Sequence, residues 1–285
     1  MTVETAKAVL KTSSLRWRAP SQFNDPFDHQ ASIIFPFTQE EFGAAFSKAF
    51  KRLIYSDELQ FNELTQLSFV IQMTRERLKH VPDTGLGEAV ELGVTESADL
   101  LKIYKEQVNS EKSKVLAQSR VLCVTERNDN VVMWSHYADS HKGVCLKLNC
   151  VDDADNALLI AKKVQYTKDL SICINLEDHI LHLTGERPID YPSLIYTIPY
   201  RKHVDWEYEE EWRVHCPHVC DETGTGYCDW VEDRRVFGAM YLGCRIEPKD
   251  AAELIGIARQ EYPHMKIFQV KQNIDKSVVE FEALS

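Results

Sequence analysis

The chain has 285 residues, of which 44% are hydrophobic and 27% are charged, and its formal net charge is -11. Because its lysines and arginines are scattered, we do not expect a broad surface that follows nucleic-acid phosphates, although a small local site for nucleic acid stays open. The longest apolar stretches fall far short of the roughly 20 residues that a membrane-spanning helix needs. The amino-terminal segment lacks the apolar core of a signal peptide. We therefore expect a cytoplasmic protein that does not bind membranes.

The eight cysteines are compatible with a reducing compartment, in which a cysteine inside an apolar strand, such as Cys123, behaves as a small hydrophobic residue. One group has the residue types of a metal site: His215, Cys216, His218, Cys220 and Cys228. The group contains no CxxC pair, and its spacing matches no closed four-ligand zinc pattern. Packing in a strand and a turn is the favoured interpretation, so no metal is expected, and metal binding stays an open alternative.

The first thirty residues predict a short helix at 4–11 and a strand at 14–18, where apolar residues alternate with arginines. The sequence Asn24-Asp25-Pro26 then predicts a fixed loop, because the residue before a proline is disfavoured in the helical conformation.

A largely helical insertion is expected at about 38–118. Thr38 and Glu41 have the spacing of a capping box, which marks the start of a helix. Two further helices are expected at about 60–80 and 96–117, separated by a loop at 81–87.

From residue 121 onward, short strands and helices alternate along the sequence. Strands are expected near 121–125, 144–148, 159–166, 209–216, 227–231, 239–242, 266–270 and 278–281, and helices near 131–140, 191–198 and 248–261. No linker is rich enough in glycine, serine or proline to require a domain boundary. We predict a single α+β domain over residues 1–285, with a central split or mixed β-sheet and the helical insertion.

The sequence Trp-Glu-Tyr-Glu-Glu-Glu-Trp-Arg at 206–213 is the first candidate for a functional site. If residues 209–216 are extended, Glu209, Glu211, Arg213 and His215 share one face of a strand. Two nearby carboxylates beside a guanidinium tend to differ in pKa, which separates the roles of acid and base. The alternative is an exposed face of cross-strand ion pairs.

A second candidate is the segment 133–143, which is expected to be helical. Trp134, Tyr137, Ala138 and His141 have the spacing of one helix face, and Gly143 is expected to cap the helix in a left-handed conformation. Core packing would explain the aromatic residues equally well, and the helix dipole would stabilise His141 as a cation without any catalytic role.

The third candidate is the segment 23–28. Asn24 and Asp25 beside a proline are typical of a loop shaped by side-chain-to-backbone hydrogen bonds, with Phe23 and Phe27 anchoring the loop to the core. A direct contact with a ligand is the alternative.

Several common catalytic signatures are absent from the sequence. It contains no phosphate-binding P-loop, no GxGxxG fingerprint after a strand, no GxSxG elbow and no HExxH motif. A Mg²⁺-dependent nuclease would need acidic residues on neighbouring elements, and Asp25, Asp28, Glu209 and Glu211 supply candidates.

Together these segments resemble a bacterial family known only as domain of unknown function 2971 (DUF2971). The shared motifs are Asn-Asp-Pro-Phe at 24–27, Met-Trp-x-x-Tyr-Ala at 133–138, His-x-Gly at 141–143, Val-x-Tyr at 164–166 and Lys-x-x-x-Trp-x-x-Glu-x-Glu-x-Arg at 202–213. The motifs occur in the expected order over nearly the whole chain. The layout of this family looks like that of ADP-ribosyltransferases, which bind NAD in the cleft of a split sheet.

The second resemblance implies a role for each candidate residue. Glu211, with Glu209 two residues earlier, would bind a ribose hydroxyl and stabilise an oxocarbenium-like centre as nicotinamide leaves. Tyr137 or Trp134 would stack on the nicotinamide ring, and His141 would orient a ribose or a phosphate. Arg18 or Arg213 would pair with the pyrophosphate, and Asn24 and Asp25 would contact the cofactor.

The resemblance therefore implies an NAD-consuming transferase or NAD glycohydrolase, with NAD as its substrate and a protein or nucleic acid as its acceptor. Such proteins often act as toxins or antiviral defence effectors. Two alternatives stay open: a metal-dependent nuclease, and a non-catalytic sensor module that binds a nucleotide or a peptide. The sequence does not identify the acceptor or the oligomeric state.

Overall fold

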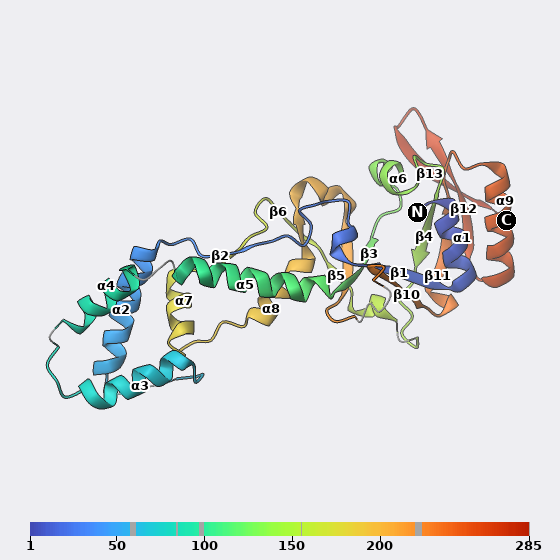
Figure 1. Ribbon diagram of the computed structural model, residues 1–285. Coiled ribbons are helices and arrows are strands. Elements are labelled where there is room, and N and C mark those ends of the chain that lie inside the picture. Colours follow the sequence, from blue (N-terminus) through green and yellow to red (C-terminus); the bar gives the residue numbers. More distant parts are fainter. Residues whose placement is uncertain (58–60, 84, 97–99, 155, 220–223, 285) are drawn as a thin grey trace. The chain divides into compact units, whose positions relative to one another are not determined.

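The computed structural model describes residues 1–57, 61–83, 85–96, 100–154, 156–219 and 224–284, which form two compact units (Figure 1). Unit 1 consists of Met1–His29, Ala117–Lys168 and Pro199–Ser285. Unit 2 consists of Gln30–Leu116 and Asp169–Ile198. Each unit is made of segments that are distant in the sequence.

The larger sheet of unit 1 is antiparallel and has the strand order β10-β1-β3-β9-β5. Its strands are β1 (Ser14–Arg18), β3 (Arg120–Thr125), β5 (Lys162–Lys163), β9 (Glu211–Cys216) and β10 (Tyr227–Val231). The pairing of β3 with β9 places Cys123 opposite Arg213 and Thr125 opposite Glu211. The candidate acidic strand therefore lies inside the sheet, with a partner on each side.

The second sheet of unit 1 is mixed and has the order β13-β12-β11-β4. It contains β4 (Val144–Leu148), β11 (Phe237–Leu242), β12 (Lys266–Asn273) and β13 (Val278–Leu284). Strands β11 and β12 are parallel and the other pairs are antiparallel. Helix α9 (Pro248–Glu261) connects the parallel pair, as a crossover between parallel strands requires.

Three helices and several 3₁₀ turns complete the described part of unit 1. The helices are α1 (Val3–Thr12), α6 (Val131–Tyr137) and α9, and the turns are η1 (Pro20–Gln22), η2 (Ala157–Ile160), η4 (Val204–Glu209) and η5 (Arg234–Val236). Strands β6 (Gln165–Thr167) and β8 (Arg201–His203) pair in parallel. Leu10, Trp17, Val214, Met240 and Leu254 belong to the main core, which contains residues from both sheets and from α1 and α9.

Unit 2 is mainly helical. It contains α2 (Gln39–Tyr55), α3 (Gln66–Leu78), α4 (Leu86–Glu96), α5 (Leu100–Ala117, whose last residue belongs to unit 1), α7 (Leu176–Leu183) and α8 (Tyr191–Ile195). A short parallel pair joins β2 (Ile33–Ile34) to β7 (Ile172–Cys173), and the turn η3 (Ile198–Tyr200) spans the boundary between the units. The capping box is confirmed, because Thr38 and Glu41 each accept a hydrogen bond from the other's backbone N–H.

The core of unit 2 contains a buried histidine surrounded by aromatic rings. The ring centroid of His179 lies 5.0 Å from that of Phe35, 5.6 Å from Phe37, 5.5 Å from Phe42 and 4.9 Å from Tyr104. Burial lowers the pKa of His179 to about 4, so the imidazole is neutral at pH 7.

The structure confirms a mixed α+β fold with several sheets and helices. Helices α2 to α5 occupy the expected insertion, although residues 60 and 97–99 of the predicted helices lie outside the described residues. The single domain stays a prediction. Among the described residues, no helix is both long and apolar enough to cross a lipid bilayer.

Two local predictions were wrong. The strand expected at 159–166 is divided into the turn η2 and the short strands β5 and β6. Strand β9 starts at Glu211 and not at Glu209, because Glu210 has a left-handed backbone with φ of 44°. Helices α4 and α7 were not predicted.

Candidate functional site

Unit 1 contains a cavity of about 1080 Å³. Strands β1, β3, β4 and β9, helix α6 and the loop after β1 contribute most of its lining. Apolar side chains make up much of the wall, and the ionisable side chains that line it include Asp28, Lys202, Glu209, Glu211 and Arg213. A large and mostly apolar cavity with a few convergent polar groups is typical of a small-molecule site.

Arg213 is fully buried, and all five of its N–H groups donate hydrogen bonds. Nε donates to Glu211 Oε1 over 2.8 Å, and Nη2 donates to Glu211 Oε2 over 2.9 Å and to Asp28 Oδ2 over 2.6 Å. Nη1 donates to Asp28 Oδ1 over 2.8 Å and to the carbonyl of Pro199 over 2.7 Å. The guanidinium therefore has no donor left for a ligand.

These contacts fix the ionisation of the two carboxyl groups. Burial alone would raise the pKa of Glu211, but the charges of Arg213 and Lys202 outweigh it and hold that pKa below its usual value. Burial also opposes ionisation of Asp28, whose pKa is lowered by hydrogen bonds from His29 and Arg213. Both side chains are carboxylates at neutral pH.

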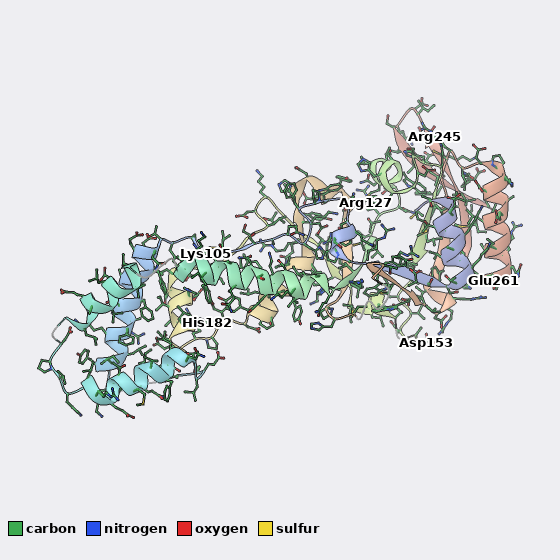
Figure 2. All side chains as sticks on the ribbon, in the orientation of Figure 1. Lys105, Arg127, Asp153, His182, Arg245 and Glu261 are labelled. Atoms are coloured by element: carbon green, nitrogen blue, oxygen red, sulfur yellow. The ribbon has the colours of Figure 1, made fainter. Side chains whose placement is uncertain are left out.

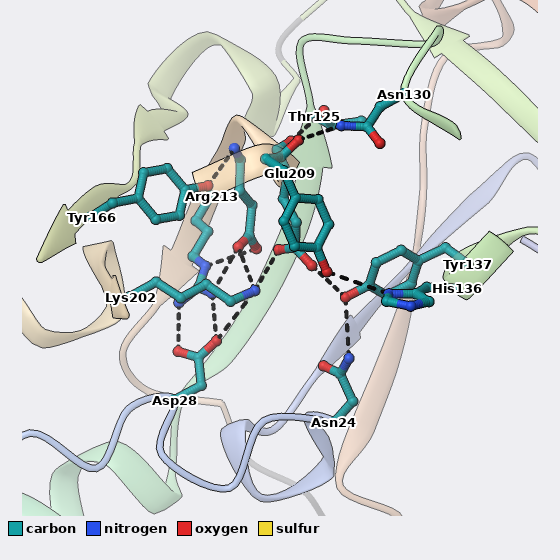
Figure 3. A network of polar contacts seen from close by, with 12 residues as sticks. Asn24, Asp28, Thr125, Asn130, His136, Tyr137, Tyr166, Lys202, Glu209 and Arg213 are labelled. Carbon is teal, nitrogen blue, oxygen red and sulfur yellow. Dashed lines mark hydrogen bonds and ion pairs between the residues drawn. The ribbon is translucent and has the colours of Figure 1, made fainter. Parts of the chain in front are cut away.

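Lys202 lies between the acidic side chains (Figure 3). Its ammonium is 2.5 Å from Glu209 Oε2, 3.1 Å from Glu211 Oε2 and 3.8 Å from Asp28 Oδ2. Burial would lower the pKa of Lys202, but Glu211 and Glu209 outweigh it and raise that pKa. Lys202 is therefore a cation that links all three carboxylates.

The network carries an excess of negative charge. Three carboxylates, Asp28, Glu209 and Glu211, face two cations, Lys202 and Arg213. His29 Nδ1 donates one hydrogen bond to Asp28 Oδ1 over 2.8 Å, but burial lowers the pKa of His29 and favours the neutral imidazole. A ligand group with positive charge would balance this excess.

A chain of hydrogen bonds extends from the network to more exposed side chains (Figure 3). Tyr137 donates its hydroxyl to Glu209 Oε1 over 2.6 Å and accepts a bond from Asn24 Nδ2 over 3.2 Å. Burial and the Glu209 carboxylate raise the pKa of Tyr137. Tyr137 is 38% exposed, so its ring is accessible in the wall of the cavity.

The backbone between the two glutamates explains how both reach the network. Glu210, in its left-handed conformation, turns its side chain toward Arg127, which donates to it over 3.0 Å (Arg127 is labelled in Figure 2). Thr125 donates its hydroxyl to the carbonyl of Glu209 over 2.6 Å, and the N–H of Glu211 donates to the hydroxyl of Tyr166 over 2.8 Å. The prediction that Glu209 and Glu211 lie close together is therefore correct. They are not, however, alternate residues of one extended strand, as the sequence analysis assumed.

Seven of the nine predicted site residues line the cavity, and two do not. Those lining it are Arg18, Asn24, Trp134, Tyr137, Glu209, Glu211 and Arg213. Asp25 is buried and accepts a hydrogen bond from the N–H of Phe27 over 2.9 Å, so it shapes the loop. Phe27 is 69% exposed, so its expected anchoring to the core is wrong.

His141, the other residue outside the cavity lining, is buried beside Trp134, with ring centroids 6.4 Å apart, and its Nε2 lies 3.0 Å from Ser135 Oγ. Burial, with Arg245, lowers the pKa of His141, so the expected cation at a helix end is disfavoured. Helix α6 ends at Tyr137, and the left-handed residues include His141 but not Gly143. Gly143 instead allows a close backbone approach, because a Cβ there would lie 2.1 Å from the carbonyl oxygen of Met1.

Sequence reasoning did not assign a site role to Lys202 or Cys123. Lys202 is the first residue of the motif at 202–213, and its place in that motif is the sequence signal that could have identified it as a site residue. Cys123 was assigned to core packing, but its side chain faces the cavity and is exposed there. Loss of hydration inside the cavity, followed by the charge of Glu211, raises the pKa of Cys123 well above the usual value, so it is a neutral thiol.

The cysteine and histidine group at 215–228 includes Cys220, which lies outside the described residues. Among the residues that the structure describes, no three His, Cys, Asp or Glu side chains are arranged to hold a metal ion. Burial lowers the pKa of His215 to about 4. Metal binding by this group stays untested.

The structure is a mixed α+β fold with a cavity whose wall carries a buried ion network. Residues 133–214 match the model of the family described as Protein of unknown function (DUF2971), and this match supports the family assignment that the motifs predicted. The matched segment includes most of α6 and of β9, and it contains Tyr137, Lys202, Glu209, Glu211 and Arg213 of the network. No curated protein and no solved structure matches the chain.

Proposed function

We propose that the chain is an NAD-consuming enzyme with an ADP-ribosyltransferase-like layout, acting as a transferase or an NAD glycohydrolase. The observation that carries the proposal is the acidic network in the wall of a cavity of about 1080 Å³. This volume is at the upper end of ligand sites, which suits a dinucleotide.

The reaction would break the bond between C1′ of the ribose and the nicotinamide nitrogen. The bonding electron pair leaves with nicotinamide, which becomes neutral, and the ribose becomes an oxocarbenium-like cation. The carboxylates of Glu209 and Glu211 would lower the energy of that cation in surroundings that exclude water. Water or an acceptor nucleophile then adds at C1′ and loses a proton.

The two predicted phosphate ligands differ in availability. Arg213 has no free donor, so it positions Glu211 and Asp28 and does not bind a ligand. Arg18 lines the cavity, is exposed, and makes no ion pair with any described side chain. Arg18 is therefore the proposed partner of the pyrophosphate.

The two aromatic candidates for the nicotinamide contact also differ in how accessible they are to a ligand. Trp134 is almost fully buried and donates its indole N–H to the carbonyl of Asn128 over 2.7 Å. Tyr137 is more exposed and already contacts Glu209. Tyr137 is thus the proposed residue for stacking on nicotinamide, with Trp134 supporting the wall.

The family resemblance extends the proposal to a protein or nucleic-acid acceptor and to a role as a toxin or antiviral defence effector. A metal-dependent nuclease has less support, because both oxygens of Glu211 already accept hydrogen bonds from cationic side chains. A sensor that binds a nucleotide without turnover is consistent with the same rigid network.

Nicotinamide release separates these alternatives. Purified protein is incubated with NAD, with and without candidate protein and nucleic-acid acceptors, and nicotinamide is measured by liquid chromatography. We expect release by the wild type and a loss of about 100-fold or more in Glu211→Gln and Glu209→Gln. Glu282→Gln, an exposed change on β13, is the matched control and should keep full activity.

Absence of nicotinamide release by the wild type, or equal release by Glu211→Gln, would contradict the proposal. NAD binding without release would favour the sensor, and nucleic-acid cleavage abolished by a chelator would favour the nuclease.

A further inference from the structure

The cavity of unit 1 differs in charge from the chain as a whole. The chain has a formal net charge of -11, yet among the residues that the structure describes the cavity is lined by six cationic and only four acidic side chains. The cations are Arg16, Arg18, Arg127, Lys147, Lys202 and Arg213. A cavity with an excess of cations in an otherwise acidic protein attracts an anionic ligand group.

Four of these six cations already have acidic partners. Two of them belong to the network of three carboxylates described above. Arg16 donates to both carboxylate oxygens of Asp229, over 2.8 and 2.7 Å. Arg127 pairs with Asp129 over 2.8 Å and with Glu210 over 3.0 Å. These four charges are therefore balanced without a ligand.

The other two cations, Arg18 and Lys147, are exposed and make no ion pair with any residue that the structure describes. Arg18 is the proposed partner of a pyrophosphate, whereas Lys147 has no role so far. A lysine without an acidic partner in the wall of a cavity keeps its three N–H donors available for an anion.

The two cations reach the cavity from different sheets. Arg18 ends β1 in the larger sheet, and Lys147 lies on β4 in the second sheet. Cys145, two residues before Lys147, packs against the cluster that contains Trp134. Because side chains alternate along a strand, Lys147 lies on that same face of β4. Trp134 lines the cavity as well, so this face of β4 is one of its walls.

We propose that Lys147 and Arg18 together bind a diphosphate, as two cations from two walls of one cavity. Their two charges match the two negative charges of the diphosphate in a dinucleotide. The network, with three carboxylates and two cations, has one excess negative charge and matches the cationic nicotinamide at the other end. The role of Lys147 rests on the proposed function, because it assigns one part of the dinucleotide to this residue.

The test uses ADP-ribose, which contains the diphosphate and lacks nicotinamide, in calorimetric titration of the full chain. We expect the wild type to bind ADP-ribose and Lys147→Gln to bind it about 10-fold or more weakly. Lys147→Arg keeps the charge and should stay within about 3-fold of the wild type. Lys266→Gln is the matched control, because Lys266 is an exposed lysine on β12 of the same sheet that does not line the cavity, and it should bind as the wild type does.

Kinetics of nicotinamide release separate binding from catalysis. The diphosphate does not change during the reaction, so Lys147→Gln should raise the KM for NAD about 10-fold and leave kcat nearly unchanged. Weaker ADP-ribose binding by Lys147→Gln in a protein that releases no nicotinamide would support the diphosphate site and contradict only the proposed function.

Other outcomes would overturn the diphosphate site. An unchanged affinity for ADP-ribose in Lys147→Gln, or nicotinamide release with an unchanged KM in that variant, would remove Lys147 from the site and leave the proposed function standing. A wild type that does not bind ADP-ribose would also contradict the site.

Discussion

In unit 1, Arg213 and Lys202 are buried as cations among three carboxylates, whereas unit 2 buries His179 as a neutral imidazole among aromatic rings. The imidazole needs no counter-ion, because burial suppresses its charge. The charges of unit 1 persist only because each has partners within hydrogen-bonding distance.

The difference is the reason for placing the proposed site in unit 1. Buried ion networks often contribute little net stability, since replacing them with apolar residues of similar size leaves the free energy of unfolding unchanged or raises it. The aromatic core of unit 2 is explained by packing alone. The charged network of unit 1 lines a cavity and is explained more simply by a ligand.

The largest expected effect comes from removing the central cation of the network. Arg213→Met leaves Asp28 and Glu211 buried without their main partner, so we expect the free energy of unfolding to fall by about 3–5 kcal/mol. Urea unfolding monitored by circular dichroism measures this change.

The control is Arg235→Met, which removes an exposed guanidinium paired with Asp153 and Asp233. That change should leave the free energy of unfolding nearly unchanged, because exposed ion pairs contribute little. A loss in Arg213→Met as small as in the control would mean that the network is not held together by its charges.

A smaller effect is expected from the buried histidine of unit 2. Its folded pKa of about 4 lies below the ordinary value of 6.5, so the unfolded chain binds a proton that the folded chain does not. The stabilisation is present above pH 6.5 and is lost as the pH falls toward 4, at up to about 1.4 kcal/mol per pH unit. His179→Phe should remove this dependence and lessen the stability lost between pH 7 and pH 5 by about 2 kcal/mol.

The exposed His80 of the same unit provides the comparison. Urea unfolding of His80→Gln, measured over the same pH range, is the control for the loss of a histidine. The same pH dependence in wild type and His179→Phe would show that His179 is not held neutral by its aromatic neighbours.

The smallest effect is expected at the start of α2. Thr38→Ala removes the side-chain oxygen that accepts from the N–H of Glu41, so the free energy of unfolding should fall by about 1 kcal/mol. Thermal unfolding detects this change, and Thr38→Ser should restore most of the loss. An unchanged melting temperature in Thr38→Ala would show that the cap contributes nothing to unit 2.

The sequence was sufficient where local chemistry decides the structure. The capping box at Thr38 and the helix that begins at Pro248 were both predicted, because a cap and a proline in the first turn act on neighbouring residues. Most strands of the two sheets of unit 1 were also predicted, since side chains alternate along them.

The sequence did not predict the features of the structure that depend on contacts between residues far apart in the chain. Glu209 and the left-handed Glu210 have hydrogen-bond partners more than eighty residues away in the chain, Thr125 for the carbonyl of Glu209 and Arg127 for the side chain of Glu210. For the same reason, Cys123 looked like a core residue within an apolar strand, and only the folded sheet shows that it faces a cavity. The candidate residues were largely right, but their geometry required the structure.

The central claim is that a nucleotide binds in the cavity of unit 1, and calorimetric titration of NAD tests it most directly. Cys123→Phe places a large ring in the cavity without removing any charge of the network. We predict that the wild type binds NAD and that Cys123→Phe, with an unchanged circular dichroism spectrum, loses affinity by about 10-fold or more. Equal affinity in the two proteins, or no binding by the wild type, would contradict the account.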